Sequence, residues 1–522
     1  MKKKSSVYIG VLCVWSVCAL ALFIACGSIV YNFLSTGITT KKIVTALLLM
    51  ANALMLAYMW LGSVKDFLFS FLFLIRKKHI LKRYDKIIHM PKEEVDRLKI
   101  DGKNPKFYLL YCTCNDFNEE ALFSCMQQDY DNFETVILDD SGQEEYKQKI
   151  DQFAQKTGAK VVRRANRKGF KAGNLNHFLS QTNDYEYCVI LDADERIPKN
   201  YIQEVLKYFA YSKTVGVVQA SHSATKGSNL FQSLMGMSVK SNGKICQVMK
   251  NFYGSNALIG HGMTISRACY EQTGGFPEVV AEDISFAIDV KNNGFRVLYA
   301  PNIECKEEFP INYLCLKKRQ AKWVQGNVEF MKNYHGDITN SKMTWYEKLD
   351  VMLSHYNLPI IPMLSFFIII NTVAIGLMNY NISGYSLAIV GLMLLFLISP
   401  LIPDFFVHDT KRQPLKLIGY ALLNFVVYAS LVPMMIATVT LALLGKKAKF
   451  IVTPKEEKKI TLKEAMLGSY DSILFACIIG MFTYVSYFSL LPTFFLVLSC
   501  ALAPIAIFLA NFPARHKRTK VV

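Results

Sequence analysis

Apolar residues gather into long runs near both ends of the chain, and one long polar region separates them. Each run is close to the roughly 20 residues that a helix needs to cross a bilayer. The runs are residues 7–31, 43–63, 354–378, 385–406, 417–444, 469–489 and 491–511. The polar region, about 76–345, is long enough to bury a core of its own. The pattern therefore predicts a helical membrane protein with an inserted globular domain.

Basic residues are concentrated beside these runs. The chain of 522 residues has a formal net charge of +18, and 52% of its residues are hydrophobic. The basic flanks are "KKK" (2–4), "RKKHILKR" (76–83), "KRQPLK" (411–416) and "ARHKRTK" near the C-terminus. Lysine and arginine beside a membrane span mark its cytoplasmic side. Since no basic stripe carries interleaved aromatic residues, the charge predicts cytoplasmic flanks and not a nucleic-acid partner.

The lysine-rich segment "GKKAKFIVTPKEEKK" (445–459) decides the expected topology. It should be cytoplasmic, but it would lie outside if 417–444 crossed the membrane. We therefore expect 417–444 to lie in the cytoplasmic interface, with two spans before the polar domain, four after it and both termini in the cytoplasm. The first run is too long for a signal peptide and lacks a clear cleavage site, so we expect a retained anchor.

The expected parts of the chain follow from these runs. They are two N-terminal transmembrane helices (1–75), a cytoplasmic α/β domain (76–310), interfacial helices (311–353), transmembrane helices 3 and 4 (354–406), an interfacial helix and loop (407–468), and transmembrane helices 5 and 6 with a basic tail (469–522). The thirteen cysteines show no metal spacing and are expected to be reduced, small buried residues.

From residue 107 onward, short apolar runs alternate with amphipathic segments. The runs "FYLLYCTC", "ETVILDD", "AKVVRR" and "YEYCVILDADE" predict strands. The segments "EEALFSCMQQ", "QEEYKQKIDQFAQKTG" and "AGNLNHFLSQ" between them predict helices. Such alternation predicts a mainly parallel sheet with right-handed crossovers. Its ligand crevice should lie at the carboxyl ends of the strands.

Two of these predicted strands end in carboxylates, at "LDDS" (138–141) and "LDADE" (191–195). Solvated strand ends are one interpretation. The other is a hard cation with oxygen ligands, Mg²⁺ or Mn²⁺, that binds a diphosphate. A turn between them carries Arg167, Lys168 and Lys171 before a helix start near Ala172, where charges and free amides could face an anion. A solvated basic turn is the alternative there.

Several motifs occur in a fixed order: "LDDS", "FKAGNLN", "DAD", "VVAEDISF" (279–286) and "RQAKW". In this order and spacing they make residues 105–460 resemble the processive inverting family 2 glycosyltransferases. These include the cellulose, chitin and hyaluronan synthases and single-gene bacterial capsule polysaccharide synthases. The resemblance implies a GT-A (Rossmann-like) cytoplasmic domain inserted in an α-helical multi-pass membrane domain. The segment "FIVTPK" (450–455) resembles the gating-loop motif of that superfamily, which implies gating-loop roles for Phe450, Val452, Thr453 and Lys455.

The resemblance also implies a donor site, position by position. The implied donor-binding residues are Phe117, Glu119, Asp139, Asp140, Lys171, Asp192, Arg319 and Lys322, with Asp194 as the ligand of Mg²⁺ or Mn²⁺. In these roles Phe117 stacks on the base, Asp139 binds uracil with Asp140 beside it, and Lys171 approaches the diphosphate.

The implied catalytic residues are Asp283, as general base for the acceptor hydroxyl, and Glu282 beside it. Transfer with inversion needs such a base and no covalent nucleophile. An ordinary helix start is the alternative interpretation of this acidic pair. The implied acceptor-binding residues are Trp323, Gln320, Gly260 and His261. For His261, a hydrogen bond to the acceptor and a structural role remain open.

The "LKKRQAKWVQGN" segment places Arg319, Lys322 and Trp323 on one helical face. Lys317 and Lys318 are expected to meet lipid headgroups. The resembled motif usually has glutamine at the position of Arg319 and arginine at that of Lys322. Because lysine lacks the bidentate fork of arginine, Arg319 could take part of the diphosphate role.

The resemblance implies a bacterial cell-membrane hexosyltransferase that polymerises a UDP-sugar and translocates the growing polysaccharide, with UDP-glucose favoured as the donor. The alternatives are a UDP-N-acetylglucosamine-using, chitin-like or hyaluronan-like synthase, a non-processive membrane glycolipid glycosyltransferase, and a channel or scaffold without catalysis. Its expected partners are the donor, the acceptor chain and the bilayer. Donor identity, linkage, branching, primer requirement, regulation and oligomeric state do not follow from the sequence.

Overall fold

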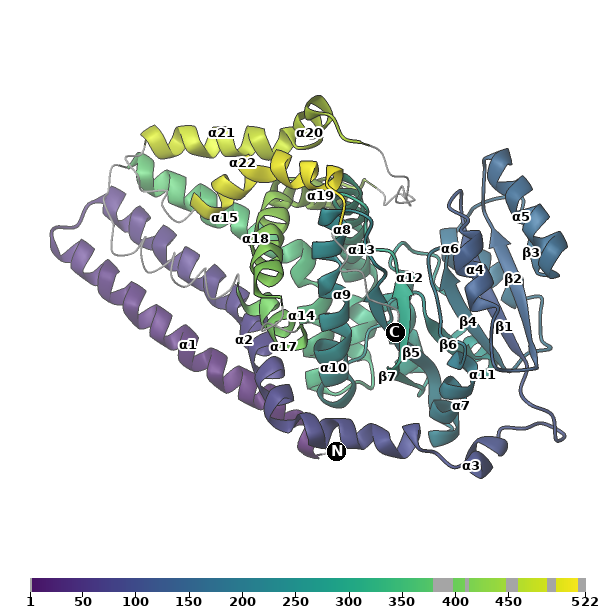
Figure 1. Cartoon of the computed structure of the whole chain (residues 1–522). Coiled ribbons are helices and arrows are strands. Elements are labelled where there is room, and N and C mark those ends of the chain that lie inside the picture. Colours follow the sequence, from purple (N-terminus) through teal and green to yellow (C-terminus); the bar gives the residue numbers. More distant parts are fainter. Residues whose placement is uncertain (1, 379–397, 409–412, 447–458, 486–493, 515–522) are drawn as a thin grey trace.

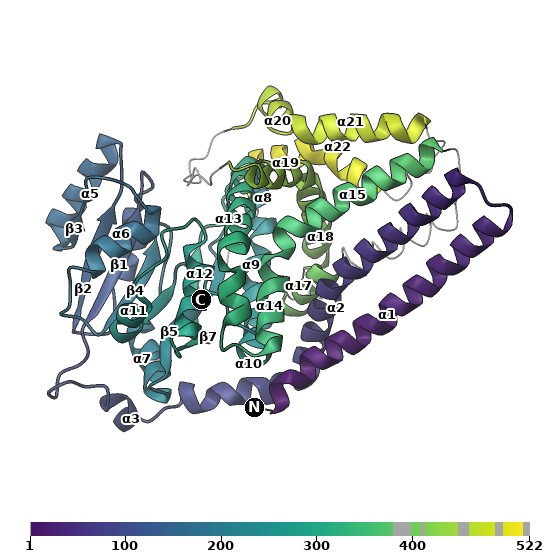
Figure 2. The same cartoon turned by 180° about the vertical axis from the view of Figure 1, so that it is seen from behind.

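The computed structural model describes residues 2–378, 398–408, 413–446, 459–485 and 494–514 (Figure 1). A bundle of long helices occupies one side of the molecule, and a sheet domain flanked by helices occupies the other. Figure 2 shows the same division from behind. The gating-loop residues 450–455 and most of the expected span 385–406 lie outside the described residues.

The longest apolar segments are α1 (Lys2–Ser35), α2 (Thr40–Ile88), α15 (Asn357–Leu377), the pair α18 (Pro414–Ser430) and α19 (Val432–Leu443), and α22 (Phe494–Phe508), and a shorter apolar helix is α21 (Tyr470–Val485). Within the described residues five helical segments are long and apolar enough to cross a membrane, and the bent pair α20 (Leu462–Gly468) and α21 makes up to six. The α1 and α2 helices lie side by side in both views, and the Trp15 indole donates a hydrogen bond of 2.6 Å to the Ala57 carbonyl. These helices support membrane association, while their orientation in a bilayer stays a prediction.

The last part of α2 belongs to the sheet domain rather than to the bundle. The first part of the chain was expected to end at residue 75, but α2 continues unbroken to Ile88. Its Ile80, Tyr84 and Ile87 are buried in the same core as the sheet. An amphipathic continuation of the span thus connects the bundle to the globular domain.

The segment expected to lie in the interface forms α18 (Pro414–Ser430) and α19 (Val432–Leu443). By length and composition alone Pro414–Leu443 could cross a membrane. In Figure 1, however, α18 runs across the direction of α15, α21 and α22. It packs against α13 (Tyr313–Asn340), where the Tyr313 and Ser430 hydroxyls lie 2.9 Å apart. Its interfacial position stays a prediction.

The globular domain is built on a seven-stranded sheet with the order β3-β2-β1-β4-β6-β5-β7. The strands are β1 (Phe107–Thr113), β2 (Phe133–Asp139), β3 (Lys160–Val162), β4 (Tyr187–Asp192), β5 (Val215–Ala224), β6 (Met263–Ser266) and β7 (Arg296–Glu307). The strands expected from the apolar runs are all present, and β1 to β4 are parallel. The expectation of a mainly parallel sheet needs one correction: β6 is antiparallel to both β4 and β5, so the sheet is mixed.

Alternate residues of β1 enter two different cores. Phe107, Leu109 and Tyr111 face the core that contains the end of α2, whereas Tyr108 and Leu110 face the core under the helices of the other side. All seven residues of β1 are buried. Burial on both faces explains why the strand is a continuous apolar run rather than an alternating one.

The remaining helices cover the sheet and lead into the bundle. They are α3 (Lys92–Asp96), α4 (Glu119–Cys125), α5 (Glu144–Thr157), α6 (Phe170–Leu179), α7 (Tyr201–Tyr211), α8 (Leu230–Met235), α9 (Met237–Ser241), the π-helix Asn242–Gln247, α10 (Val248–Tyr253), α11 (Arg267–Thr273), α12 (Glu282–Asn292), α14 (Trp345–His355) and α17 (Ile402–Val407), with 3₁₀ turns at Ser399–Leu401 and Leu509–Asn511. The helices expected before β2, β3 and β4 are therefore confirmed.

Candidate active site

A cavity of about 930 Å³ lies between the carboxyl ends of β1 and β4 and the helices α6, α12 and α13. It brings together most of the site residues predicted from the sequence. Those that line it are Asp140, Lys171, Asp192, Asp194, Gly260, His261, Glu282, Asp283, Arg319, Lys322 and Trp323. The cavity continues past them to Lys250 on α10, His355 at the end of α14 and Leu358 at the start of α15. The cavity thus joins the edge of the sheet to the start of α15, a helix that is long and apolar enough to cross a membrane.

Lys171 and Asp192 form the ionic centre of the cavity. The Lys171 ammonium donates hydrogen bonds to the Asp192 carboxylate and, at 2.8 Å, to the Gly260 carbonyl. Burial by itself would lower the pKa of Lys171, but the charge of Asp192 outweighs it, so the pKa lies above its ordinary value. Burial would raise the pKa of Asp192, but Lys171 and His261 outweigh it and lower that pKa. Both groups are therefore charged at neutral pH.

The first turn of α6 aims Lys171 at Asp192. The helix follows Gly169, whose φ of 72° lies in the left-handed region that favours glycine. Phe170 has a φ of 50° as well. A sharp turn at these two residues places Lys171 at the helix start, where the sequence predicted it.

Glu282 and Asp283 are the first two residues of α12, and both carboxylates reach the cavity. The Ile284 amide donates a hydrogen bond of 2.8 Å to Asp283 Oδ1. Burial, followed by repulsion from Asp283, raises the pKa of Glu282, and burial raises the pKa of Asp283. A carboxylate with a raised pKa is a stronger base, as proton abstraction from a hydroxyl requires.

Gly260 packs against this acidic pair. It has a φ of 90°, and a Cβ at this position would lie 3.3 Å from Asp283 Oδ2. The space at this glycine, which the resemblance implied for acceptor binding, is bordered here by the Asp283 carboxylate.

The α13 helix presents Arg319, Lys322 and Trp323 to the cavity on one face, as the spacing predicted. The Arg319 guanidinium lies 4.6 Å from the ring centre of Trp323 and 4.8 Å from that of Phe309. Trp323 is 44% exposed, so one side of the indole is available for a ligand. The stacked guanidinium and indole can bind an anionic group and a sugar side by side.

Lys317 does not take the headgroup role expected for it. Its ammonium lies 2.5 Å from Asp471 Oδ1 and donates to the Gly468 carbonyl at 3.0 Å. The ion pair connects α13 to the start of α21. An engaged, partly buried ammonium is a helix contact and not a free cation for lipid.

Four predicted residues do not line the cavity. Phe117 packs edge-on against Tyr111 and Phe153, with ring centres 5.9 and 5.5 Å apart. Asp139 is buried, and its Oδ2 lies 2.7 Å from Arg163 Nε. Glu119 is exposed at the start of α4, and Gln320 is buried on α13. Their ligand roles therefore stay predictions.

The structure adds residues that the sequence did not single out for the site. His222 on β5, Glu307 at the end of β7 and Tyr428 on α18 line the cavity. No local signal marks them, because each comes from a different element. Arg167, which the basic turn had suggested as an anion contact, also lines it.

The segment that contains most of the predicted site residues matches a known protein family. Residues 187–400 match the family model described as "Glycosyl transferase family group 2". The match includes β4 with its carboxylates, the acidic pair of α12 and the face of α13. Over this segment the chain is similar to family 2 glycosyltransferases, which supports the expected class of enzyme.

A curated relative is the beta-monoglucosyldiacylglycerol synthase of Synechocystis sp.. It is 29% identical over 256 residues, which are 46% of this chain and 53% of the relative, so the chain spans about half the length of this relative. Its name is that of a glycolipid synthase, so the more specific expectation of a processive polysaccharide synthase is not confirmed.

Among solved structures, the mannosyltransferase PcManGT from Pyrobaculum calidifontis in complex with GDP-Man and Mn²⁺ is 21% identical, with a TM-score of 0.45 over 70% of this chain and 96% of that chain. Residues 1–349 of TarS from S. aureus in complex with UDP-GlcNAc are 16% identical, with a TM-score of 0.35 over 59% of this chain and 92% of that chain.

The basic face of α13 gives a first test. We expect Arg319→Ala to weaken inhibition by UDP more than Lys322→Ala does, because the guanidinium is fixed by stacking on Trp323 and can bind a phosphate with two donors. Inhibition constants for UDP, measured with both variants, check this prediction. Unchanged constants in both would mean that α13 does not contact the nucleotide.

Proposed function

We propose that the protein is an inverting membrane glycosyltransferase that transfers a hexose from a UDP-sugar to an acceptor bound on the membrane side of the cavity. One observation supports the proposal above the others: the acidic pair of α12 lies in the same cavity as the Lys171 and Asp192 centre and the Trp323 face. A base, an anion site and a sugar platform are the parts that such a transfer needs.

The proposed reaction is a single displacement. Asp283 accepts the proton of the acceptor hydroxyl while the hydroxyl oxygen forms a bond to C1 of the donor sugar. The bond between C1 and the diphosphate oxygen breaks on the opposite face, and UDP leaves with the electron pair. Lys171 and Arg319 stabilise the negative charge on the leaving diphosphate. Asp283 then returns its proton to water.

A divalent cation fits this scheme, because Asp194 lines the cavity with its carboxylate. When bound, Mg²⁺ or Mn²⁺ would neutralise part of the diphosphate charge. The residues of the chain supply the base, the acceptor contact and the remaining positive charge.

A membrane lipid is the acceptor that we favour. The matched relative is named as a synthase of a glucosylated diacylglycerol, and the cavity continues to the first turn of α15. The same relative supports UDP-glucose as the donor. A growing polysaccharide is the second candidate acceptor, because "FIVTPK" resembles a gating loop of processive synthases.

The size and solubility of the product test the proposal. Full-length protein in lipid nanodiscs is incubated with radiolabelled UDP-glucose, Mn²⁺ and a bacterial lipid extract. We expect label in the organic phase as a short glycolipid, and the same reaction with UDP-N-acetylglucosamine measures donor choice.

Label in high-molecular-mass, glucanase-sensitive material would support the polysaccharide candidate instead. No transfer from either donor, in a preparation that binds UDP, would contradict the proposed function. The Asp283→Asn protein, prepared in the same way, is the negative control: label that it transfers comes from contaminating transferases.

A further inference from the structure

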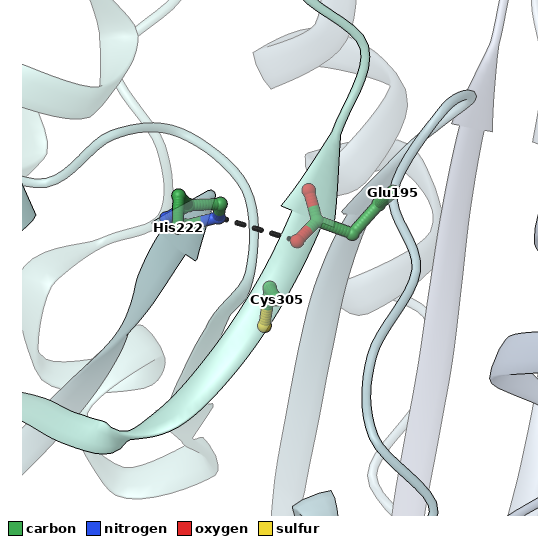
Figure 3. Close-up of side chains that lie close together, drawn as sticks. All are labelled: Glu195, His222 and Cys305. Atoms are coloured by element: carbon green, nitrogen blue, oxygen red, sulfur yellow. Dashed lines mark ion pairs between the residues drawn. The ribbon is translucent and has the colours of Figure 1, made fainter. Parts of the chain in front are cut away.

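The two ends of the cavity differ in how their polar side chains are paired. At the end near the sheet, His222 Nε2 lies 3.2 Å from Glu195 Oε1. Figure 3 shows these two side chains facing one another beside Cys305. His261 forms ion pairs with both Glu195 and Glu307. At the other end, toward the start of α15, buried side-chain oxygens have no hydrogen-bond partner within the described residues. We call this second region the α15 end of the cavity.

Two amide side chains supply these oxygens. Gln247, the last residue of the π-helix, and Asn327 on α13 both line the cavity. Gln247 is 7% exposed and Asn327 is 9% exposed. Neither Gln247 Oε1 nor Asn327 Oδ1 accepts a hydrogen bond from any of the residues that the structure describes. A buried acceptor without a donor is costly, and a functional role is one explanation for its persistence.

Lys250 brings hydrogen-bond donors to the same end. It lies three residues after Gln247, on α10, and it lines the cavity with only 9% of its surface exposed. Its ammonium donates a hydrogen bond of 2.6 Å to the Ser354 hydroxyl, which in turn donates to Asp350 Oδ1 at 3.5 Å. Burial lowers the pKa of Lys250, and the charge of Asp350 opposes this shift. The counter-charge thus lies behind Ser354, and the ammonium has further protons to donate.

His355 adds a neutral imidazole beside this lysine. It follows Ser354 in the chain and lines the cavity. Its ring meets that of Phe330 edge-on, with the ring centres 5.6 Å apart, and Phe330 lies three residues after Asn327 on α13. Burial, followed by repulsion from Lys250, lowers the pKa of His355 to about 3. The neutral ring carries one donor and one acceptor.

The α15 end begins beside the acidic pair of α12. A Cβ on Gly326 would lie 3.4 Å from the Cβ of Ala281, which directly precedes the acidic pair. Asn327 follows Gly326, and the lining continues to Leu358 at the start of α15. When the reacting hydroxyl of an acceptor reaches Asp283, this end of the cavity can therefore hold the rest of the acceptor.

The mixture of donors and acceptors selects the chemistry of the ligand. A phosphate only accepts hydrogen bonds, so it could not satisfy the oxygens of Gln247 and Asn327. An acyl chain could satisfy neither these oxygens nor the Lys250 ammonium. A sugar hydroxyl both donates and accepts hydrogen bonds, and a sugar ring carries several of them side by side. Among these ligands, a sugar fits the α15 end.

We propose that Gln247, Lys250, Asn327 and His355 form a sugar subsite for the acceptor, so that the protein extends a molecule that already carries a sugar. The inference rests on the proposed function, because the subsite holds the acceptor of that transfer. It excludes bare diacylglycerol as the preferred acceptor, since this lipid has a single hydroxyl and the reaction consumes it. A glycosylated lipid and an oligosaccharide both offer the required hydroxyls.

A choice among acceptors tests the subsite. Full-length protein in phosphatidylcholine nanodiscs is incubated with radiolabelled UDP-glucose, Mn²⁺ and one of three acceptors: diacylglycerol, its monoglucosyl derivative or cellotetraose. We expect transfer to a glucosylated acceptor to exceed transfer to diacylglycerol by roughly tenfold or more, because a site built to bind hydroxyls rejects a ligand that lacks them. Preference for the glucosyl lipid would identify a glycolipid as the source of the sugar, and preference for cellotetraose would identify an oligosaccharide.

Gln247→Met and Asn327→Leu test the named residues. Each change removes an amide oxygen and keeps a side chain of similar shape. We expect KM for the glucosylated acceptor to rise by roughly two- to tenfold, the usual effect of one lost hydrogen bond, without a matching change in UDP affinity. The matched control is Asn333→Leu, an exposed asparagine of α13 that does not line the cavity. Gln247→Met should not lower the melting temperature, because the lost oxygen has no partner among the described residues.

Equal transfer to diacylglycerol and to the glucosylated acceptors would overturn the inference and leave the proposed function standing. An unchanged KM in both folded variants would overturn it too. Binding of cellotetraose in the presence of UDP, followed by saturation-transfer difference NMR, separates the two claims. Binding that Gln247→Met weakens, with no sugar transfer to any acceptor, would leave the subsite standing without the function. Neither binding nor transfer, in protein that binds UDP, would contradict both.

Discussion

Replacing Asp283 with asparagine is expected to lower sugar transfer by roughly 10²–10⁴-fold, the usual contribution of a general base. Asparagine keeps the size of the side chain and the oxygen that accepts the Ile284 amide, but it cannot take a proton from the acceptor hydroxyl. UDP binding should be nearly unchanged, because Lys171, Asp192 and α13 remain intact. The effect should therefore fall on the turnover number.

The matched control is Asp289→Asn on the same helix. Asp289 contacts the Tyr334 hydroxyl at 3.3 Å and does not line the cavity. Transfer rates and UDP affinities of both variants, measured side by side, check the prediction. Near-normal turnover in Asp283→Asn would show that another group, with Glu282 the first to examine, takes the proton.

Replacing Lys171 with methionine is the second large effect that we expect. The ammonium connects Asp192 to the Gly260 carbonyl, and in the proposed reaction it faces the leaving diphosphate. Its loss removes one preorganised positive charge, for which a decrease in turnover of roughly 10²–10³-fold is typical. It also leaves the Asp192 carboxylate without this cation, so UDP binding should weaken as well. The combined loss distinguishes this variant from Asp283→Asn.

Lys168→Met is the matched control, because Lys168 is an exposed lysine in the turn just before the same helix. It should transfer sugar and bind UDP like the unmodified protein. The measurements are turnover and the UDP dissociation constant. Equal losses in both variants would mean that only the general charge of the turn matters, and that Lys171 has no specific contact with the diphosphate.

Local sequence patterns predicted the first four strands and the helices between them well. Each of these strands is a short apolar run, and each helix has an amphipathic repeat within a few residues. The β6 strand escaped prediction because "MTIS" has only four residues and follows a glycine-rich segment. Its antiparallel place between β4 and β5 depends on pairing with residues far away in the chain.

Neighbouring strand-end residues show why part of the predicted site lies outside the cavity. Asp139 and Asp140 were expected to share one ligand, but successive residues of a strand point to opposite faces of the sheet. Asp139 therefore pairs with Arg163 on one side, while Asp140 pairs with Arg164 and lines the cavity. For Phe117, contacts with Tyr111 and Phe153 outcompete an exposed stacking position, because burial of an aromatic ring is favourable.

By itself, the sequence determined the long apolar helices and the globular domain, the parallel half of the sheet, and the carboxylates and Lys171 at its edge. These depend on hydrophobic periodicity and on residues that are adjacent in the chain. Only the tertiary structure decided that Asp283, Lys171 and Trp323 line one cavity with the start of α15, and that His222, His261 and Glu307 converge. Such convergence is set by strand order and by the packing of α13 and α18, which no local pattern encodes.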